Sequence, residues 1–207
     1  MTVTYDDASH AYTVDGVRVP SVTEIAGILT AGKYAEGNPA ALAQAQRRGT
    51  EVHEICQQID CGIDPEELEI PPELTGYVNG YLAFLRDWGP EWDYMEKIVY
   101  TRDYAGRADR IGRIDGKTAV VDIKTTAVMD RLSKLALLAQ LQGYGEAWQD
   151  MGNPPVFHRL GVQLKHNGRY TLHWGWKIED KYLDADTTAA GLFTNCLALA
   201  RLIGGYE

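Results

Sequence analysis

Hydrophobic and polar residues alternate along several short stretches of the chain, and a period of two residues is typical of half-buried β-strands. Three such stretches begin the sequence, with a turn signal at Asp15-Gly16, and three more lie near the middle. The last two flank Asn167-Gly168, a dipeptide that favours a hairpin turn. The predicted strands cover about 3–5, 11–14, 17–19, 94–100, 105–114, 118–125, 157–166 and 169–176.

Apolar residues spaced three and four apart predict helices between these strands. Ser21 and Glu24 have the spacing of a capping box at the start of the first helix. A second helix is expected to begin after Gly49, with Thr50 as its cap. Its buried stripe comprises Val52, Ile55, Cys56 and Ile59. Further helices are predicted over about 74–85, 130–150 and 184–203. This order predicts an α/β (α+β) fold in which a central mixed sheet is flanked by helices.

The chain of 207 residues is long enough for one sizeable core, so we expect a single domain over 1–207 with an N-terminal β-hairpin and helix as an extension. Its 45% hydrophobic and 24% charged residues are typical of a soluble globular protein. No apolar stretch is long enough to span a bilayer, and the N-terminus lacks the pattern of a signal peptide. We therefore expect a cytoplasmic protein without a membrane partner.

The formal net charge of -9 is unevenly distributed. Residues 1–96 hold five basic and seventeen acidic residues, a net charge of -12, whereas residues 97–134 hold nine basic and five acidic residues, a net charge of +4. This distribution argues against a protein that coats nucleic acid with its whole surface, because such proteins neutralise many phosphates. This basic segment also contains the carboxylates and the lysine that are candidates for a functional site.

The segment GRADRIGRIDGKTAVVDIKTT within this region predicts a hairpin with two facing carboxylates. Asp115-Gly116 is a favoured two-residue turn, which makes Ile114 and Lys117 the first pair across it. Partners in such a hairpin have a constant index sum, so Asp109 faces Asp122 with Cβ atoms ~5 Å apart. Two facing carboxylates destabilise a sheet unless a positive charge lies between them.

Lys124 follows Asp122 by two residues, and strand alternation points both side chains to the same face. The neighbouring positions Ala119, Val121 and Ile123 point to the other face and are predicted core. The apolar run AVV indicates a strand that is buried on both faces.

Two interpretations of these charges remain open at this stage. Hard divalent cations such as Mg²⁺ bind carboxylate oxygens and can activate water at a phosphodiester, with a nearby lysine stabilising the developing charge. Alternatively, the segment is a solvated surface hairpin whose acids pair with Arg107, Arg110 and Arg113.

Five elements with characteristic residues occur in a fixed order along the chain. They are RGTEVHEI with His53, a strand with Glu96, GRADRI with Asp109, VVDIKTT with Asp122 and Lys124, and QLQGY with Gln140 and Tyr144. In this order they resemble the PD-(D/E)XK nuclease superfamily, and most closely its RecB-like and phage lambda-type exonuclease branch. The resemblance covers about residues 47–144, and VPSVTEI also resembles phage members. Ala108 stands where the name-giving proline would be, and the cluster-forming cysteines of some RecB-like nucleases are missing.

The resemblance implies a restriction-endonuclease-like core with a site for Mg²⁺ or Mn²⁺. The implied metal ligands are His53, Asp109, Asp122 and the main-chain carbonyl of Ile123. Lys124 is expected to position the attacking water. The implied supporting residues, for the lysine and the DNA backbone, are Glu96, Gln140 and Tyr144. Thr125 either donates a hydrogen bond to phosphate or ends its strand.

The expected function is that of a divalent-metal-dependent DNA nuclease, a phage-type exonuclease that acts in recombination or DNA end processing. A catalytically silent nucleic-acid-binding or assembly module on the same scaffold is the first alternative. An endonuclease or an RNA nuclease is the second. The expected partner is DNA. Because the basic zone is small and the rest of the protein is acidic, a single-strand annealing protein or a homo-oligomer is suggested as a source of additional DNA contacts.

Overall fold

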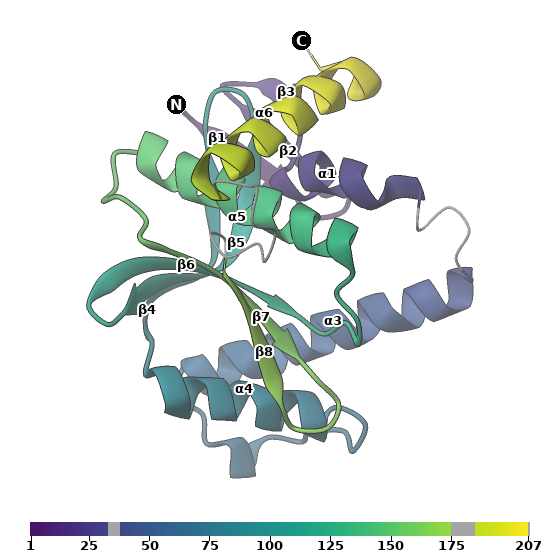
Figure 1. The fold of residues 1–207 in the computed structure, drawn as a ribbon, viewed down its shortest axis with the longest axis vertical. Coiled ribbons are helices and arrows are strands. Elements are labelled where there is room, and N and C mark those ends of the chain that lie inside the picture. Colours follow the sequence, from purple (N-terminus) through teal and green to yellow (C-terminus); the bar gives the residue numbers. More distant parts are fainter. Residues whose placement is uncertain (33–37, 175–184, 207) are drawn as a thin grey trace.

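The computed structural model describes residues 1–32, 38–174 and 185–206 (Figure 1). The strands are β1 (Val3–Asp6), β2 (Ala11–Val14), β3 (Val17–Val19), β4 (Glu91–Tyr100), β5 (Ala105–Ile114), β6 (Lys117–Lys124), β7 (His158–Leu164) and β8 (Tyr170–Trp174). The helices are α1 (Val22–Gly27), α3 (Pro39–Asp60), α4 (Thr75–Trp88), α5 (Arg131–Asp150) and α6 (Ala185–Gly204), with short 3₁₀ helices η1 (Ile28–Thr30) and η2 (Pro65–Glu67).

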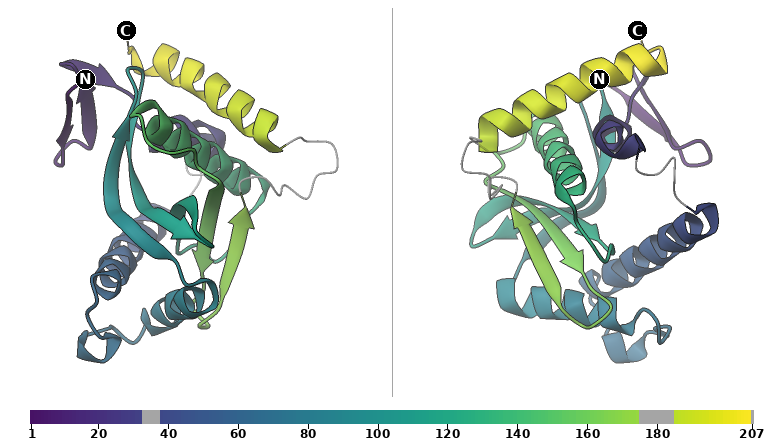
Figure 2. Two further views of the ribbon diagram at one scale, coloured as in Figure 1. Left: turned by 90° about the vertical axis from the view of Figure 1, so that its left-hand side faces the viewer. Right: turned by 45° about the vertical axis from the view of Figure 1, so that its right-hand side comes forward.

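Five strands form the central sheet in the order β4-β5-β6-β7-β8. Strands β6 and β7 run parallel and the other neighbouring pairs are antiparallel, so the sheet is mixed. Helices α1, α5 and α6 pack together on one side of this sheet, and α3 and α4 lie on the other (Figure 2). The predicted α+β fold, a multistranded sheet flanked by helices, is confirmed.

Two apolar clusters hold these layers together, and β6 contributes to both. Val120 packs into the cluster that includes Leu141 of α5, whereas Val121 packs into the cluster that includes Phe84 of α4. All three residues of the AVV run are buried. The strand is therefore buried on both faces, as its apolar run predicts.

The N-terminal strands β1, β2 and β3 form a separate antiparallel sheet. Its residues Tyr12 and Val14 pack against Ala105 at the start of β5. Helix α1 follows directly, and the predicted capping box is confirmed, because Ser21 Oγ accepts from the N–H of Glu24 while Glu24 accepts from the N–H of Ser21. This small sheet consequently lies beside the end of β5 that carries the candidate site.

Helix α3 begins earlier than the sequence pattern predicts. It starts at Pro39 with Asn38 as its cap, so Gly49 and Thr50 lie inside the helix and the predicted start after Gly49 is wrong. Its first half has no apolar stripe, and hydrophobic periodicity therefore gives no signal there. In the predicted stripe Val52 and Cys56 are buried, while Ile55 and Ile59 are half-buried.

The hairpin between β5 and β6 has the predicted turn and register. Asp115 and Gly116 both have positive φ angles, of 51° and 71°, as a type I′ turn requires. Ile114 pairs with Lys117, and the same register continues to Arg110 and Val121. The predicted register is confirmed over this length.

The hairpin between β7 and β8 differs from its prediction in the turn. Leu164 pairs with Tyr170, and Lys165 N–H donates to the carbonyl of Arg169, which leaves a loop of three residues, 166–168, instead of two. Gly168 takes the positive φ of 80° that ends such a loop. The predicted strand residues 175–176 and the predicted helix start at 184 lie outside the described residues.

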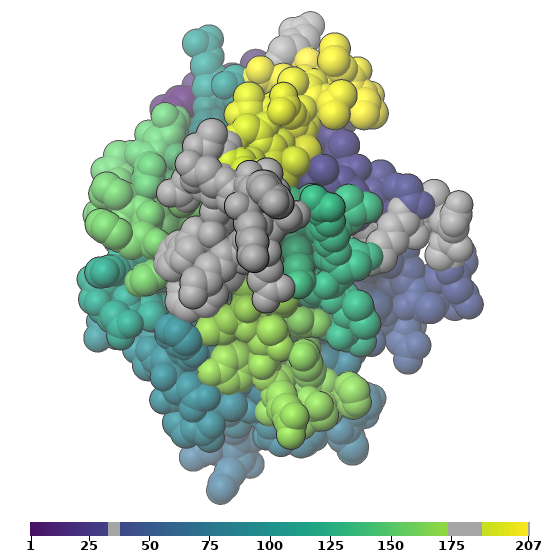
Figure 3. Space-filling model, viewed as in Figure 1, coloured from purple at the N-terminus to yellow at the C-terminus, as the bar shows by residue number. Residues whose placement is uncertain are grey.

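Helix α6 packs on α5 and α1 and forms part of the molecular surface (Figure 3). It is among the longest helices described. Within residues 1–32, 38–174 and 185–206, no helix combines the length and the apolar character that crossing a membrane requires.

Candidate metal centre

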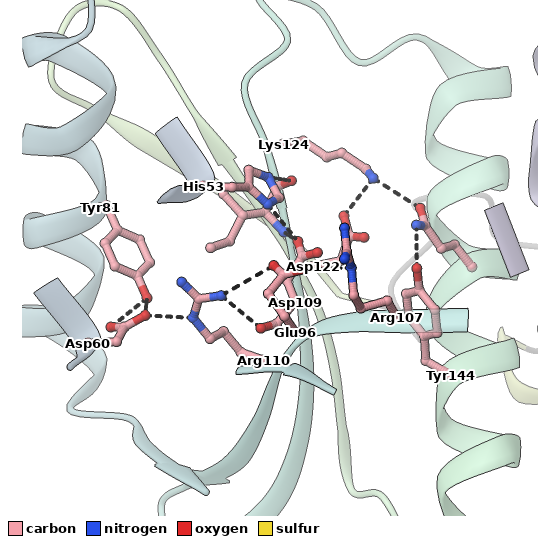
Figure 4. Close-up of polar contacts among 12 residues, drawn as sticks. His53, Asp60, Tyr81, Glu96, Arg107, Asp109, Arg110, Asp122, Lys124 and Tyr144 are labelled. Atoms are coloured by element: carbon pink, nitrogen blue, oxygen red, sulfur yellow. Dashed lines mark hydrogen bonds and ion pairs between the residues drawn. The ribbon is translucent and has the colours of Figure 1, made fainter. Parts of the chain in front are cut away.

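A cavity of about 500 Å³ opens where the ends of β4, β5 and β6 meet α3 and α5. Its lining includes ionisable residues from four of these elements, and Figure 4 shows how they converge: His53, Glu96, Asp109, Asp122 and Lys124. The N-terminal sheet contributes another wall through Tyr5 and Tyr12. Residues far apart in the sequence are thus brought to one cleft.

Asp109 is the central carboxylate of the cleft. It is 8% exposed, and its Oδ2 accepts a hydrogen bond of 2.6 Å from the main-chain N–H of Ile123. This bond joins the ends of β5 and β6 one step beyond Arg110 and Val121, the last pair of the regular ladder. The predicted pairing of Asp109 with Asp122 would be the next step of this ladder but is not among its pairs; Asp109 instead contacts the main chain at Ile123, the residue after Asp122.

His53 reaches the same point from α3. Its Nε2 lies 3.0 Å from the carbonyl oxygen of Ile123, and its Nδ1 lies 3.7 Å from Asp109 Oδ2. When Nε2 carries the proton, it donates to this carbonyl and the lone pair of Nδ1 faces Asp109. A metal-binding histidine commonly donates its other ring N–H to a backbone carbonyl in this way.

Asp122 and Lys124 form an ion pair inside the cleft. Asp122 is 1% exposed, and its Oδ2 lies 2.8 Å from Lys124 Nζ. Burial raises the pKa of Asp122 to about 6; Lys124 opposes this rise, and the neighbouring charge of Asp109 adds to it. Burial therefore disfavours the charge on Asp122 more than Lys124 stabilises it.

The position of Lys124 is fixed by a chain of hydrogen bonds to α5. Lys124 Nζ donates to Gln140 Oε1 at 3.0 Å, and Gln140 Nε2 donates to the hydroxyl of Tyr144 at 3.0 Å. Gln140 and Tyr144 lie four residues apart and therefore on one face of the helix. Burial raises the pKa of Tyr144, so its hydroxyl stays protonated.

Glu96 enters the cleft from β4 on the opposite side of Asp109. Its Oε2 lies 2.9 Å from Arg107 Nε. Burial raises the pKa of Glu96, and the charge of Asp109 raises it further, whereas Arg107 lowers it. Burial therefore disfavours the charge on this carboxylate although two arginines, Arg107 and Arg110, lie within ion-pair distance of it.

The donor atoms of this cleft suit a divalent cation. One ligand atom each from His53, Glu96 and Asp109 lie within 4.8 Å of one another. This group contains Glu96, predicted as a supporting residue, and does not contain the predicted ligand Asp122, which pairs with Lys124. Carboxylate oxygens suit Mg²⁺ and Mn²⁺. Burial is the main cause of the raised pKa values of Glu96 and Asp122, and the charge of Asp109 adds to both; a bound cation would favour the ionised acids.

The predicted site residues are brought together with one exception. All of the predicted side-chain ligands and supporting residues line the cleft: His53, Glu96, Asp109, Asp122, Lys124, Gln140 and Tyr144. The carbonyl of Ile123 contacts His53. Thr125 is buried at the end of β6 outside the cleft lining, where its carbonyl accepts a hydrogen bond from Arg48.

The solvated-hairpin interpretation does not fit this geometry, because Asp109 and Asp122 are both buried. The side chains of the three arginines pair with other acids. These pairs are Arg107 with Glu96, Arg110 with Asp60, and Arg113 with Glu91 and Asp93.

A buried ionic cluster behind the site was missed from the sequence. Arg110 is 0% exposed; its Nε lies 2.5 Å from Asp60 Oδ2, and Tyr81 donates its hydroxyl proton to Asp60 (Figure 4). Arg110 Nη1 also donates to the carbonyl of Asp109 at 2.7 Å. The hairpin register contained a signal, since it places Arg110 opposite Val121, a predicted core residue.

Comparisons with known proteins give little information on this chain. No protein-family model and no curated protein sequence matches it. Among solved structures, a crystal structure of SSO0001 aligns with a TM-score of 0.39 and 17% sequence identity, over 90% of this chain and 79% of that chain. So low a TM-score does not establish a common fold.

Proposed function

We propose that this protein is a divalent-metal-dependent DNA nuclease, an exonuclease of the PD-(D/E)XK type that its ordered sequence elements resemble. The observation that carries the proposal is the ion pair of 2.8 Å between Lys124 and the buried Asp122, beside Asp109 and His53 in one cleft. A lysine held against an acid that can bind a cation is suited to phosphodiester hydrolysis.

The cation fits the acidic half of this cleft. His53, Glu96 and Asp109, whose ligand atoms lie close together, would hold it. The family resemblance adds Asp122, which pairs with Lys124 in the cation-free protein, and the Ile123 carbonyl would either bind the cation directly or orient His53. Bound Mg²⁺ or Mn²⁺ supplies a more acidic water and neutralises charge on a phosphodiester.

The residues of the chain supply orientation and charge. The ammonium of Lys124 is fixed between Asp122 and Gln140, and Tyr144 fixes Gln140 in turn. From this position Lys124 orients the attacking water and donates a hydrogen bond to the negative charge that develops on the phosphate oxygens. A donor that is positioned before the reaction needs no rearrangement in the transition state.

The decisive experiment incubates the protein with end-labelled linear DNA and with closed circular DNA, each with Mg²⁺ or Mn²⁺. An exonuclease degrades the linear molecule and spares the circle, whereas an endonuclease opens the circle. Labelled RNA in a parallel reaction tests the RNA nuclease alternative.

The variant Lys124→Met should lower the cleavage rate by about 10²- to 10³-fold, the usual effect of removing one transition-state donor. Lys117→Met is the matched control, because Lys117 lies on the same strand but is exposed at the hairpin turn. Full activity of Lys124→Met would refute the proposal. DNA binding without hydrolysis under any divalent ion would favour the catalytically silent module instead.

A further inference from the structure

The ion pair between Arg107 and Glu96 lies where two cavities adjoin. The cleft of the candidate metal centre is one of them. A second cavity of about 390 Å³ lies along α3, and the two share His53, Glu96 and Arg107 in their linings. The pair therefore stands at the junction of the two cavities.

Glu96 is held at this junction by a strained backbone. Four described residues other than glycine have positive φ angles, and three of them, His10, Asp15 and Asp115, lie in turns. Glu96, with φ of 49°, lies inside β4. Such a conformation costs about 1–3 kcal/mol and persists where the surrounding structure enforces it, often at functional sites.

In the cation-free chain Arg107 is the nearer of two arginines that stabilise the charge on Glu96; Arg110 Nη1 lies 3.8 Å from Glu96 Oε1. The two side chains are joined at 2.9 Å, and burial and Asp109 both disfavour an unpaired charge on Glu96. A divalent cation bound by His53, Glu96 and Asp109 would provide the same compensation from the other side. The cation and Arg107 therefore compete for one carboxylate.

We propose that Arg107 is an exchangeable partner of Glu96: it pairs with this carboxylate until a divalent cation binds there, and then contacts a phosphate of the DNA substrate. This inference rests on the proposed function for the identity of the cation and of the substrate. It assigns to Arg107 a phosphate-binding role that depends on the cation.

The surroundings of Arg107 suit such an exchange. Its side chain is 41% exposed, so a phosphate can reach it from solvent. Its guanidinium carbon lies 5.4 Å from the ring centroid of Tyr5, a cation–π distance that holds the group at the cleft independently of Glu96. A guanidinium has five N–H donors and binds phosphate oxygens well.

The first test measures Mn²⁺ binding by titration calorimetry, without nucleic acid. Arg107→Gln removes the competitor and should tighten Mn²⁺ binding by about two- to five-fold, the range expected for one exposed ion pair. Arg113→Gln is a closely matched control, because Arg113 also lies on β5, also pairs with acids of β4 and is 47% exposed. It should leave Mn²⁺ affinity unchanged.

The second test measures binding of a short fluorescein-labelled oligothymidylate by anisotropy, in EDTA and in Ca²⁺, which takes the same oxygen ligands as Mg²⁺. In Ca²⁺, Arg107→Gln should weaken binding by about ten-fold, as expected for one charge-assisted hydrogen bond. In EDTA the variant should bind like the wild type. Glu96→Gln frees Arg107 without a cation, so it should strengthen binding in EDTA.

Unchanged or weaker Mn²⁺ binding by Arg107→Gln would overturn the inference, as would an equal effect of this variant on the oligonucleotide in EDTA and in Ca²⁺. Equal shifts in Arg113→Gln would also overturn it, because they would reflect net charge alone. These readouts need no cleavage. If the protein shows the exchange but never cleaves DNA, the proposed nuclease function is refuted and the proposed exchange stands. If it cleaves DNA without showing the exchange, the nuclease function stands and the exchange is refuted.

Discussion

Replacing Asp122 with asparagine should stabilise the cation-free protein at neutral pH, although the residue belongs to the proposed active site. Asp122 is almost fully buried, and burial together with the charge of Asp109 raises its pKa from 3.8 to about 6 in spite of Lys124. Asparagine has nearly the shape of the protonated acid. It should therefore keep the packing of the cleft and remove the buried charge.

The magnitude follows from the pKa of Asp122. A rise from 3.8 to about 6 corresponds to ~3 kcal/mol between the charged and the protonated folded protein. The folded protein holds this proton more tightly than the unfolded chain does, so the contribution of Asp122 to stability falls as the pH rises from about 4 to about 6. The advantage of Asp122→Asn should accordingly be near zero at about pH 4 and reach about 2–3 kcal/mol at about pH 8.

The assay is urea unfolding in EDTA at these two pH values. Asp115→Asn is the control, because Asp115 is exposed at the turn of the same hairpin and its replacement should change stability by less than about 0.5 kcal/mol. Added Mn²⁺ should stabilise the wild type more than Asp122→Asn, because it binds the folded protein through this acid. A variant no more stable than the wild type at about pH 8 would refute the buried-charge argument.

Three further substitutions test the buried pair behind the site and the packing of two helices elsewhere in the fold. Arg110→Met leaves the buried charge of Asp60 unpaired and should lower the free energy of unfolding by about 3–5 kcal/mol in urea denaturation; a loss below about 1 kcal/mol would contradict the buried pair. Gly76→Ala puts a Cβ onto the main-chain carbonyl of His166 and should lower the melting temperature through a loss of about 1–3 kcal/mol. Gly191 lies in open space on α6, so Gly191→Ala should increase the free energy of unfolding by up to about 1 kcal/mol and thereby raise the melting temperature. A Gly76→Ala variant as stable as the wild type would refute the close approach at Gly76.

The sequence predicted the core of the site because local rules determine it. The Asp115-Gly116 turn fixes the hairpin, and a constant register then brings Asp109 to the neighbourhood of Asp122 without any knowledge of the rest of the fold. Strand alternation placed Lys124 on the same face. The approach of Gln140 was expected from the family resemblance, and its hydrogen bond to Lys124 agrees with that expectation.

Other features depend on contacts that no local pattern encodes. The first half of α3 is rich in alanine and glutamine, which favour a helix by propensity but give no apolar stripe, so Gly49 was taken as its boundary. The positive φ of Glu96 is imposed by its surroundings within the sheet. The pairing of Asp60 with Arg110 joins residues fifty positions apart.

The ionic cluster behind the site explains how this arrangement of acids can fold before a cation binds. Arg110 neutralises Asp60, donates to the main chain at Asp109 and lies 3.8 Å from Glu96, so one buried guanidinium joins α3, β4 and β5 at the base of the cleft. On the cleft side, Lys124 compensates the negative charge of Asp122 through their ion pair. A buried pair of this kind contributes little net stability compared with apolar packing, but loss of either partner strongly lowers the free energy of unfolding. We therefore expect its contribution to be positional: it holds the main chain at Asp109 in place, while Arg107 and Lys124 face the cleft.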